Sequence, residues 1–265
     1  MMVAGVSGAR AAGLSRFLEP ARGATLLMEV ASRKQFTNHS ESLRFLLPPG
    51  STLKPFVLAS LMASGKLTPQ TSSVCPLHLT IQGRRLDCSH PPIAAAIDVR
   101  TALAYSCNCY VAKMAERFEP YELHRELAAF GLATHARRAA LEQQKLQALG
   151  ANAIQVTAVD LATAYRQLAL RATQPVFSTI VEGMEDAVQF GTAQLASVKG
   201  QQIAGKTGSA VTQNGTRVAW FAGFMPSRAP KVVSVVMLSG HSGGSDAAPI
   251  AAEILSAYAR GGLRG

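Results

Sequence analysis

The chain has few charged residues, one tryptophan and no long hydrophobic run. Charged residues make up 16% of its 265 residues and hydrophobic residues 48%, a balance typical of globular proteins and not of disordered ones. No run approaches the roughly eighteen apolar residues that a membrane-spanning helix needs. The N-terminal stretch contains Arg10 and Arg16 and lacks an apolar segment with a cleavage site, so no secretory signal is visible.

Acidic residues are scarce. There are 16 of them against 26 basic residues, which gives a formal net charge of +10. A basic surface favours polyanions such as nucleic acid, anionic lipid or an acidic polymer. No dense basic run is interleaved with aromatic residues, which argues against nucleic acid.

Cysteines are too few for a disulfide scaffold in a chain of this length, since there are only four: Cys75, Cys88, Cys107 and Cys109. Cys75 and Cys88 flank a short polar stretch and could form one bridge in an oxidising compartment. His78 and His90 lie in the same stretch, so a metal site is also conceivable. Because Cys-x2-His followed by Cys-x-His is not a usual zinc spacing, a bridge or two free thiols is the preferred interpretation.

Short apolar runs bounded by polar or turn residues predict four strands: 23–30, 203–211, 217–225 and 231–239. Asn214-Gly215 lies between the second and third strands and is a strong hairpin signal. Helical periodicity predicts helices over 51–64, 98–118, 120–130, 155–170, 185–198 and 246–260, with Thr157 as a cap and residues 70–96 rich in loops.

This order of elements predicts an α/β (α+β) fold. Its antiparallel sheet is built from both chain ends and flanked by helices, and a helical insertion over about 66–185 forms a second lobe. Residues 1–22 are expected to be a disordered segment, and 23–265 are expected to form one domain.

Ser51 and Lys54 lie three residues apart at the start of a predicted helix, directly after Pro48-Pro49-Gly50. That spacing puts both side chains on one face, where a neutral amine can take the proton of the hydroxyl and turn it into a nucleophile. The pattern alone is weak, because about one Ser-x-x-Lys is expected by chance in a chain of this length. The alternative is a serine cap followed by a solvated lysine.

Two further polar patterns contain candidate site residues. Ser106 and Asn108 lie in the Ala-rich helical region, where a second hydroxyl can relay a proton and a carboxamide can hold a substrate amide. The strand 203–211 carries Lys206, Thr207, Gly208 and Ser209. Its lysine is a second cation that would depress the pKa of Lys54 if the two lie close. Its hydroxyls can bind a carboxylate, and its glycine allows a ligand to approach the backbone.

The three patterns occur once each, in the order Ser-x-x-Lys, Ser-x-Asn, Lys-Thr-Gly. In this order the chain resembles the penicillin-binding transpeptidases of the β-lactamase-like superfamily. The surrounding residues resemble that family too, and the similarity covers roughly residues 23–260. The matching segments are 49–56, 102–110, 155–169, 204–210 and 219–224.

The resemblance implies a reaction and a role for each residue. Ser51 would attack the penultimate D-Ala carbonyl of a peptidoglycan stem peptide, with Lys54 as the base. Ser106 would pass the proton to the leaving amine and Asn108 would hold the substrate amide. The strand residues would recognise the terminal carboxylate, and the N–H groups of Ser51 and Ser209 would form the oxyanion hole.

The implied partners are D-Ala-D-Ala stem peptides, β-lactams as covalent inhibitors and membrane-anchored cell-wall proteins. No nucleic acid, metal or organic cofactor is implied. Such transpeptidases usually carry an N-terminal membrane anchor and a pedestal domain, and neither fits before Gly23. We expect an isolated catalytic module, a truncated chain or a divergent relative that has lost function, in a periplasmic or other extracytoplasmic location.

Three other functions share these motifs. A D,D-carboxypeptidase differs only in its acceptor. A β-lactamase needs a group that activates water, and no glutamate lies in the expected Glu-x-x-Leu-Asn context. A β-lactam sensor or cell-wall partner would be acylated without turnover.

Overall fold

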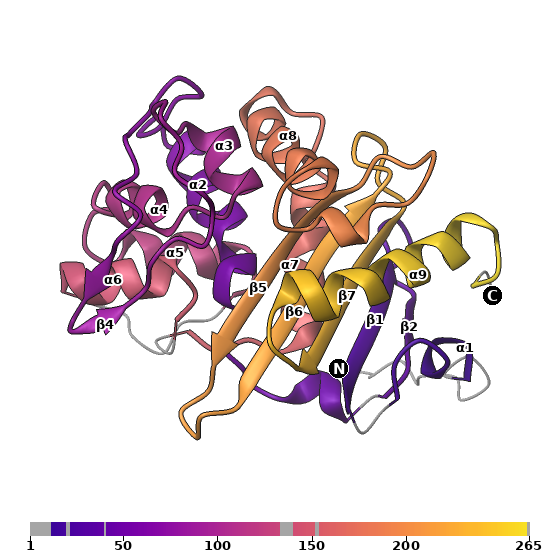
Figure 1. Cartoon of the computed structure of the whole chain (residues 1–265). Helices are drawn as coiled ribbons and strands as arrows, with labels where there is room; N and C mark the ends of the chain where they lie inside the picture. Colours follow the sequence, from indigo (N-terminus) through magenta and orange to yellow (C-terminus); the bar gives the residue numbers. More distant parts are fainter. Residues whose placement is uncertain (1–11, 20–21, 40, 133–139, 152–153, 264–265) are drawn as a thin grey trace.

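A five-stranded sheet and a helical lobe make up the computed structural model, which describes residues 12–19, 22–39, 41–132, 140–151 and 154–263 (Figure 1). The strands are β1 (Gly23–Glu29), β2 (Gln35–Thr37), β5 (Ala204–Val211), β6 (Arg217–Met225) and β7 (Val232–Ser239). Their order is β2-β1-β7-β6-β5, and every neighbouring pair is antiparallel. Since β1 pairs with β7, the sheet is built from both chain ends, as predicted.

The four predicted strands are all present, each within about two residues of its expected bounds. The Asn214-Gly215 signal is also confirmed. Gly215 has φ of +84°, and the N–H of Thr212 donates to the carbonyl of Thr216 at 2.9 Å to close the loop between β5 and β6. The short strand β2 was not predicted.

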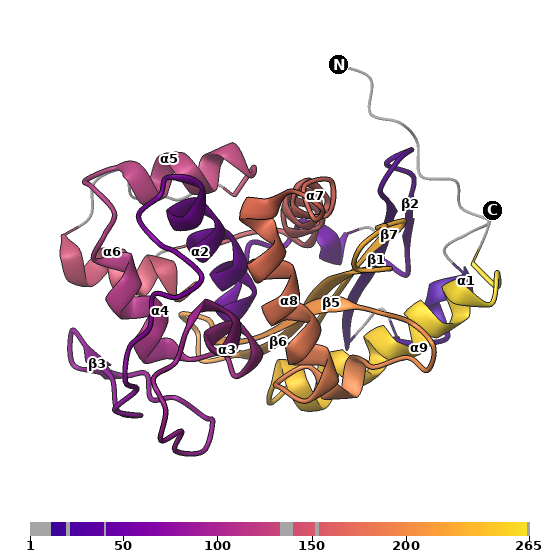
Figure 2. The ribbon, with the colours of Figure 1, turned by 90° about the horizontal axis from the view of Figure 1, so that it is seen from above.

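Helices cover both faces of the sheet (Figure 2). On one face lie α1 (Ala12–Ser15) and α9 (Ala248–Ala259), on the other α7 (Ala158–Ala169) and α8 (Pro175–Gln189). The alternation of a strand separates the two cores: Trp220 and Phe224 point into the core that contains α7, Ala219 and Phe221 into the core that contains α9. The predicted cap of α7 is confirmed, since Thr157 and Asp160 form a capping box.

The helical lobe contains α2 (Lys54–Ala63), α3 (Val99–Ala104), α4 (Asn108–Ala115), α5 (Glu122–Ala129), α6 (Leu141–Ala148) and the small hairpin of β3 (Thr80–Ile81) with β4 (Arg84–Arg85). A single hydrophobic core runs from this lobe to the sheet, and α8 contacts both α3 and β5. The extent predicted for the lobe, 66–185, includes α7 and most of α8, which pack on the sheet. The lobe boundaries stay a prediction.

The predicted disordered segment 1–22 falls largely on residues 1–11 and 20–21, which lie outside the described residues. Within the described part, Leu14 and Leu18 are buried in the core beneath α9. No helix among the described residues has the length and apolar character required to cross a bilayer.

Two helix predictions are wrong in their bounds. The helix predicted over 98–118 is broken into α3 and α4, because Ser106 adopts a left-handed conformation with φ of +57°. The helix predicted over 185–198 is α8, which starts at Pro175, a favoured first residue of a helix, and ends at Gln189. Only the short 3-10 turn Gln194–Ala196 follows.

Candidate active site

Ser51 lies in a 3-10 turn, Gly50–Leu53, which leads directly into α2. Side chains from distant segments hold the backbone of this turn. The indole of Trp220 donates to the carbonyl of Pro48 at 3.0 Å, and the Tyr165 hydroxyl donates to the carbonyl of Thr52 at 2.9 Å. Ser51 itself is half-buried, so its hydroxyl is accessible on a turn fixed from both sides.

Two glycines allow β5 to lie against this turn. A Cβ atom on Gly208 would be 2.5 Å from the carbonyl oxygen of Pro49. Gly50 has φ of +55°, and a Cβ there would be 2.7 Å from the carbonyl oxygen of Ser209. The backbone of Ser209 therefore lies beside the turn that contains Ser51, as the predicted oxyanion hole requires. β5 is also an edge strand of the sheet.

Lys54 is fully buried and connects the start of α2 to the break between α3 and α4. Its Nζ donates to the carbonyl oxygen of Ser106 at 2.6 Å, to Ser106 Oγ at 3.2 Å and to Asn108 Oδ1 at 2.5 Å. Burial lowers the pKa of Lys54 to about 8. Among the described residues no hydrogen bond joins Lys54 to the Ser51 hydroxyl, one helical turn before it.

The break between α3 and α4 places Ser106 and Asn108 beside Lys54. Asn108 also donates from Nδ2 to the carbonyl oxygens of Leu86 and Asp87, at 3.0 and 3.2 Å. Its carboxamide thus bridges the buried amine and the loop that follows β4. The continuous helix predicted from the sequence would not have given this arrangement.

Lys206 is the second buried cation. Its Nζ donates to the carbonyl of Thr207 at 3.2 Å and to Thr192 Oγ1 at 3.5 Å, and Thr207 Oγ1 donates to Thr192 Oγ1 at 3.1 Å. Burial, and next the charge of Lys54, hold the pKa of Lys206 well below its usual value. The charge of Lys54 thus lowers the pKa of Lys206, whereas the predicted reverse effect of Lys206 on Lys54 is not among the causes of the lowered Lys54 pKa, which is lowered by burial.

A pocket of about 320 Å³ lies over these groups. Five predicted site residues line it: Ser51, Ser106, Asn108, Thr207 and Ser209. Lys54 and Lys206 are fully buried and are not among its lining residues, and Gly208 faces the turn that contains Ser51. The structure therefore brings all eight predicted residues into one region.

The pocket has four further lining residues that the sequence interpretation missed: Ser89, Thr192, Ser242 and Gly244. Ser242 and Gly244 belong to the Gly/Ser-rich stretch after β7, in which Gly243–Ala247 form a short π-helix. The N–H of Gly243 donates to Ser209 Oγ at 3.0 Å, so this stretch positions a predicted substrate-binding hydroxyl. In the sequence, only the Gly/Ser-rich composition of this stretch could have indicated that it lines the site.

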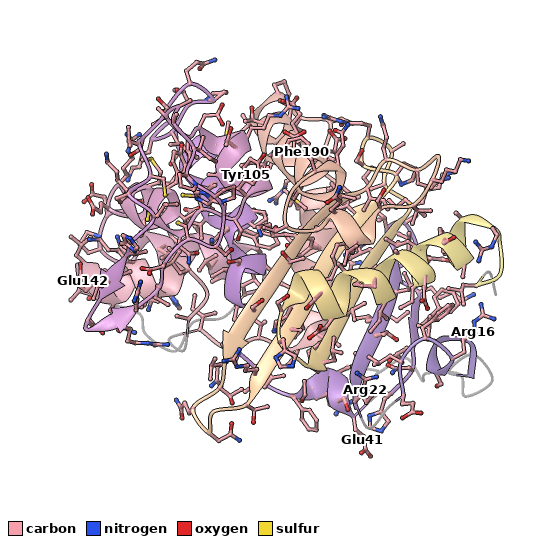
Figure 3. The ribbon with its side chains drawn as sticks, viewed as in Figure 1. Arg16, Arg22, Glu41, Tyr105, Glu142 and Phe190 are labelled. Carbon is pink, nitrogen blue, oxygen red and sulfur yellow. The ribbon has the colours of Figure 1, made fainter. Side chains whose placement is uncertain are left out.

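Aromatic side chains lie beside the Ser106 turn. Tyr105 and Phe190, labelled in Figure 3, have ring centroids 5.9 Å apart, and His90 is 6.2 Å from Tyr105. Phe190 is exposed at the end of α8. An exposed ring at this position offers an apolar contact to a bound chain molecule.

The arrangement suits acyl transfer. It combines the hydroxyl of Ser51 at a helical turn with the buried amine of Lys54, whose pKa is lowered. The hydroxyl of Ser106 is hydrogen-bonded to that amine, and backbone N–H groups lie near an edge strand. Hydroxyls of Thr207 and Ser209 beside Lys206 are suited to hold a carboxylate.

Comparisons with known proteins agree with this geometry. The family model for the penicillin binding protein transpeptidase domain matches residues 16–256. A curated relative from Neisseria flavescens, named "Probable peptidoglycan D,D-transpeptidase PenA", is 25% identical over 258 residues. The match covers 80% of this chain and 64% of the relative, so the chain spans somewhat less than two thirds of that protein.

Solved structures show the same fold at 20% identity. The transpeptidase domain of Burkholderia pseudomallei penicillin-binding protein 3 superposes with a TM-score of 0.82, covering 97% of this chain and 95% of that one. Pseudomonas aeruginosa PBP2 in complex with WCK 5153 gives a TM-score of 0.75, with 93% and 76% covered. From its sequence match, site geometry and fold, the chain belongs to the penicillin-binding protein transpeptidase domain family.

Proposed function

We propose that this chain is a serine D,D-transpeptidase that forms an acyl-enzyme on Ser51. The hydrogen bonds from buried Lys54 to Ser106 and Asn108 carry the proposal. They join the first two motifs through one buried amine of lowered pKa, an arrangement that suits proton transfer. The name of the Neisseria relative supports the same reaction class, and the fold that this chain shares with its structural neighbours agrees with it.

In the acylation step, Ser51 Oγ attacks the carbonyl carbon of the penultimate D-Ala residue. A C–O ester bond forms and the C–N bond to the terminal D-Ala breaks. The hydroxyl proton passes to the neutral amine of Lys54 and through Ser106 Oγ to the leaving amine. The N–H groups of Ser51 and Ser209 stabilise the oxyanion.

In the second step, an amine of another stem peptide attacks the ester carbonyl. The new amide forms, the Ser51–O–acyl bond breaks and the hydroxyl regains its proton. β-Lactams acylate Ser51 in the same way, by opening of the lactam C–N bond. Because this chemistry needs peptidoglycan as its substrate, the proposal includes a periplasmic or other extracytoplasmic location, alongside membrane-anchored cell-wall proteins.

One observation favours this function over β-lactamase activity. None of the described residues that line the pocket is acidic, so no carboxylate there can activate water for rapid deacylation. The penicilloyl ester is therefore expected to be long-lived. A D,D-carboxypeptidase would use the same acylation step with water as acceptor.

The test is labelling by a fluorescent penicillin. We expect covalent labelling of the wild type and of Ser72→Ala, an exposed serine in the helical lobe, and none of Ser51→Ala. Equal labelling of all three would exclude Ser51 as the nucleophile. Rapid turnover of a chromogenic cephalosporin would replace the transpeptidase proposal with a β-lactamase.

A further inference from the structure

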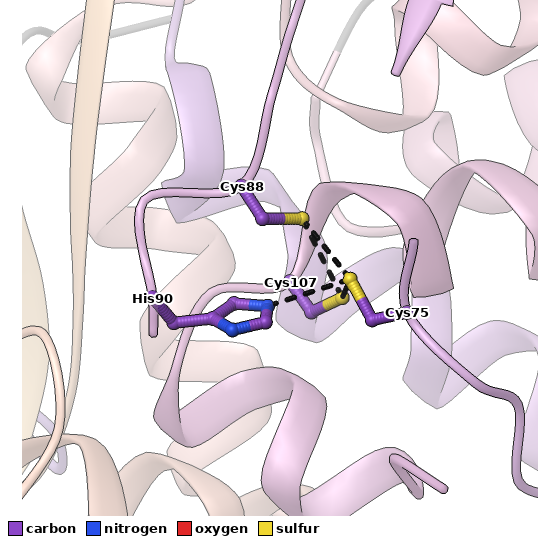
Figure 4. A group of neighbouring side chains, drawn as sticks. All are labelled: Cys75, Cys88, His90 and Cys107. Atoms are coloured by element: carbon purple, nitrogen blue, oxygen red, sulfur yellow. Dashed lines mark hydrogen bonds between the residues drawn. The ribbon is translucent and has the colours of Figure 1, made fainter. Parts of the chain in front are cut away.

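Three cysteines and a histidine meet beside the candidate active site, as Figure 4 shows. Cys75, Cys88 and His90 come from the loops around the small hairpin, and Cys107 comes from the break between α3 and α4. The proposed function assigns no role to these four side chains. Cys107 lies between Ser106 and Asn108, so the cluster touches the second motif directly.

The distances are those of a tetrahedral metal site. Cys75 Sγ lies 3.6 Å from Cys88 Sγ and 3.5 Å from Cys107 Sγ, and Cys88 Sγ lies 3.7 Å from Cys107 Sγ. His90 Nε2 is 3.6 Å from Cys75 Sγ, and all four ligand atoms lie within 4.8 Å of one another. Tetrahedral zinc separates two sulfur ligands by about 3.8 Å and a sulfur from a nitrogen by about 3.6 Å.

The histidine is held in the tautomer that a metal ligand needs. Its Nδ1–H donates to the carbonyl oxygen of Pro91 at 2.8 Å, which leaves the lone pair of Nε2 directed to the sulfurs. His78, the other histidine of the stretch, is exposed and pairs with Asp87 instead. The ligand set therefore differs from the Cys-x2-His pair considered in the sequence.

Backbone N–H groups point at each sulfur. Asn108 N donates to Cys88 Sγ at 3.2 Å, Tyr110 N to Cys107 Sγ at 3.4 Å and Leu77 N to Cys75 Sγ at 3.4 Å. Such donors stabilise thiolates, the form of cysteine that binds zinc. No disulfide is formed, and the four cysteines of the chain are free thiols.

We propose that Cys75, Cys88, His90 and Cys107 bind one Zn²⁺ ion in a closed, structural Cys3His site. Four protein ligands leave no open position, so the ion does no chemistry on the substrate. The three thiols release their protons to solvent on binding, and the loops around the hairpin become fixed to the second motif. The metal also keeps clustered thiols from oxidation in an extracytoplasmic setting.

The site acts on the nucleophile through Cys107. A Zn–S bond at this residue fixes the backbone between Ser106, with its left-handed φ of +57°, and Asn108. The three hydrogen bonds that Lys54 Nζ donates all end on those two residues. We therefore expect the ion to position Lys54, a consequence that rests on the proposed function, whereas metal binding does not.

The first experiment measures metal content by elemental mass spectrometry on protein purified without chelator. One zinc per chain is expected in the wild type and in Cys109→Ser, whose sulfur lies 3.5 Å from Cys88 Sγ but outside the four-ligand cluster. Cys75→Ser and His90→Ala should lose most of the zinc. A wild type without zinc, or with a Cys75–Cys88 disulfide in its peptide map, would overturn the proposal.

A second measurement does not depend on how well the variants fold. Wild-type protein stripped of metal and loaded with Co²⁺ should show the intense thiolate charge-transfer and tetrahedral ligand-field bands of a three-sulfur site. Octahedral cobalt bands without charge transfer would contradict the assignment. Zinc should displace the cobalt and abolish the bands.

The coupling to the active site has its own readout. Removal of zinc by a chelator should slow penicillin acylation of Ser51 roughly tenfold or more, and restored zinc should recover it. An unchanged rate in metal-free protein would disprove the positioning role. If zinc binds but penicillin does not label, the metal site stands and the proposed function fails.

Discussion

Lys54 Nζ lies 2.5 Å from Asn108 Oδ1, in a contact between the start of α2 and the start of α4. The amine is fully buried, and every hydrogen bond that the structure gives it ends on the second motif. This one contact joins the turn that carries Ser51 to the break between α3 and α4. Changes on either side of it should therefore affect the same rate.

Removal of the amine should abolish most of the acylation. Lys54→Met keeps the length and apolar stem of the side chain but has no base, so the second-order rate of penicillin acylation should fall about 10²–10⁴-fold. Lys199→Met, an exposed lysine away from the pocket, should keep the wild-type rate. Stopped-flow fluorescence measures both, and an equal effect in the two variants would contradict a catalytic role.

The rate should depend on pH through the lowered pKa of Lys54. Burial places this pKa at about 8, and the neutral amine is the base. Acylation should therefore rise as pH increases through about 8 and level off above it. The profile is measured with a single β-lactam at constant ionic strength. A rate that falls over this interval would mean that the protonated lysine is the reactive form.

A negative charge beside the amine should shift that profile. Asn108→Asp keeps an acceptor for Lys54 and adds a carboxylate, which favours the ammonium form and raises its pKa. The midpoint should move above about 8. Asn214→Asp, in the exposed hairpin loop, should leave it unchanged. An unshifted midpoint in a folded Asn108→Asp protein would mean that Lys54 is not the group whose titration controls the rate.

The close approach of β5 to the turn that contains Ser51 should tolerate no side chain. Gly208→Ala would place Cβ 2.5 Å from the carbonyl oxygen of Pro49 and 2.9 Å from Thr52 Cγ2. Separation of the two segments should cost about 1–3 kcal/mol of stability and slow acylation at least about tenfold. Gly13→Ala, whose Cβ would meet only Leu263 Cδ2 at 3.5 Å, is the matched control. Thermal melting and labelling rates measure the two effects, and wild-type values for Gly208→Ala would disprove the steric argument.

Much of the fold followed from local patterns. The strands were predictable because each is a short apolar run between turn residues, and the Asn214-Gly215 loop because its glycine needs a positive φ. The Thr157 cap was predictable because the capping residues are close in sequence.

The features that shape the site depend on distant contacts. The break at Ser106 lies in an Ala-rich stretch of high helix propensity, and it is held by Lys54, which is 52 residues away. Thr192 is one threonine without a local pattern, yet it accepts from both Lys206 and Thr207. The metal site considered from the sequence contained three of the four cluster residues, and it missed Cys107 because this residue lay in a predicted helix.

The central claim is that Ser51 is the acylated residue. Wild-type protein is incubated with penicillin, and its intact mass is measured over time. The protein is then digested with trypsin and the labelled peptide is identified. One lasting adduct per chain is expected, on the peptide 45–66, since trypsin cleaves after Arg44 and Lys66 but not between Lys54 and Pro55. An adduct on any other peptide, or an intact mass that never changes, would contradict the account.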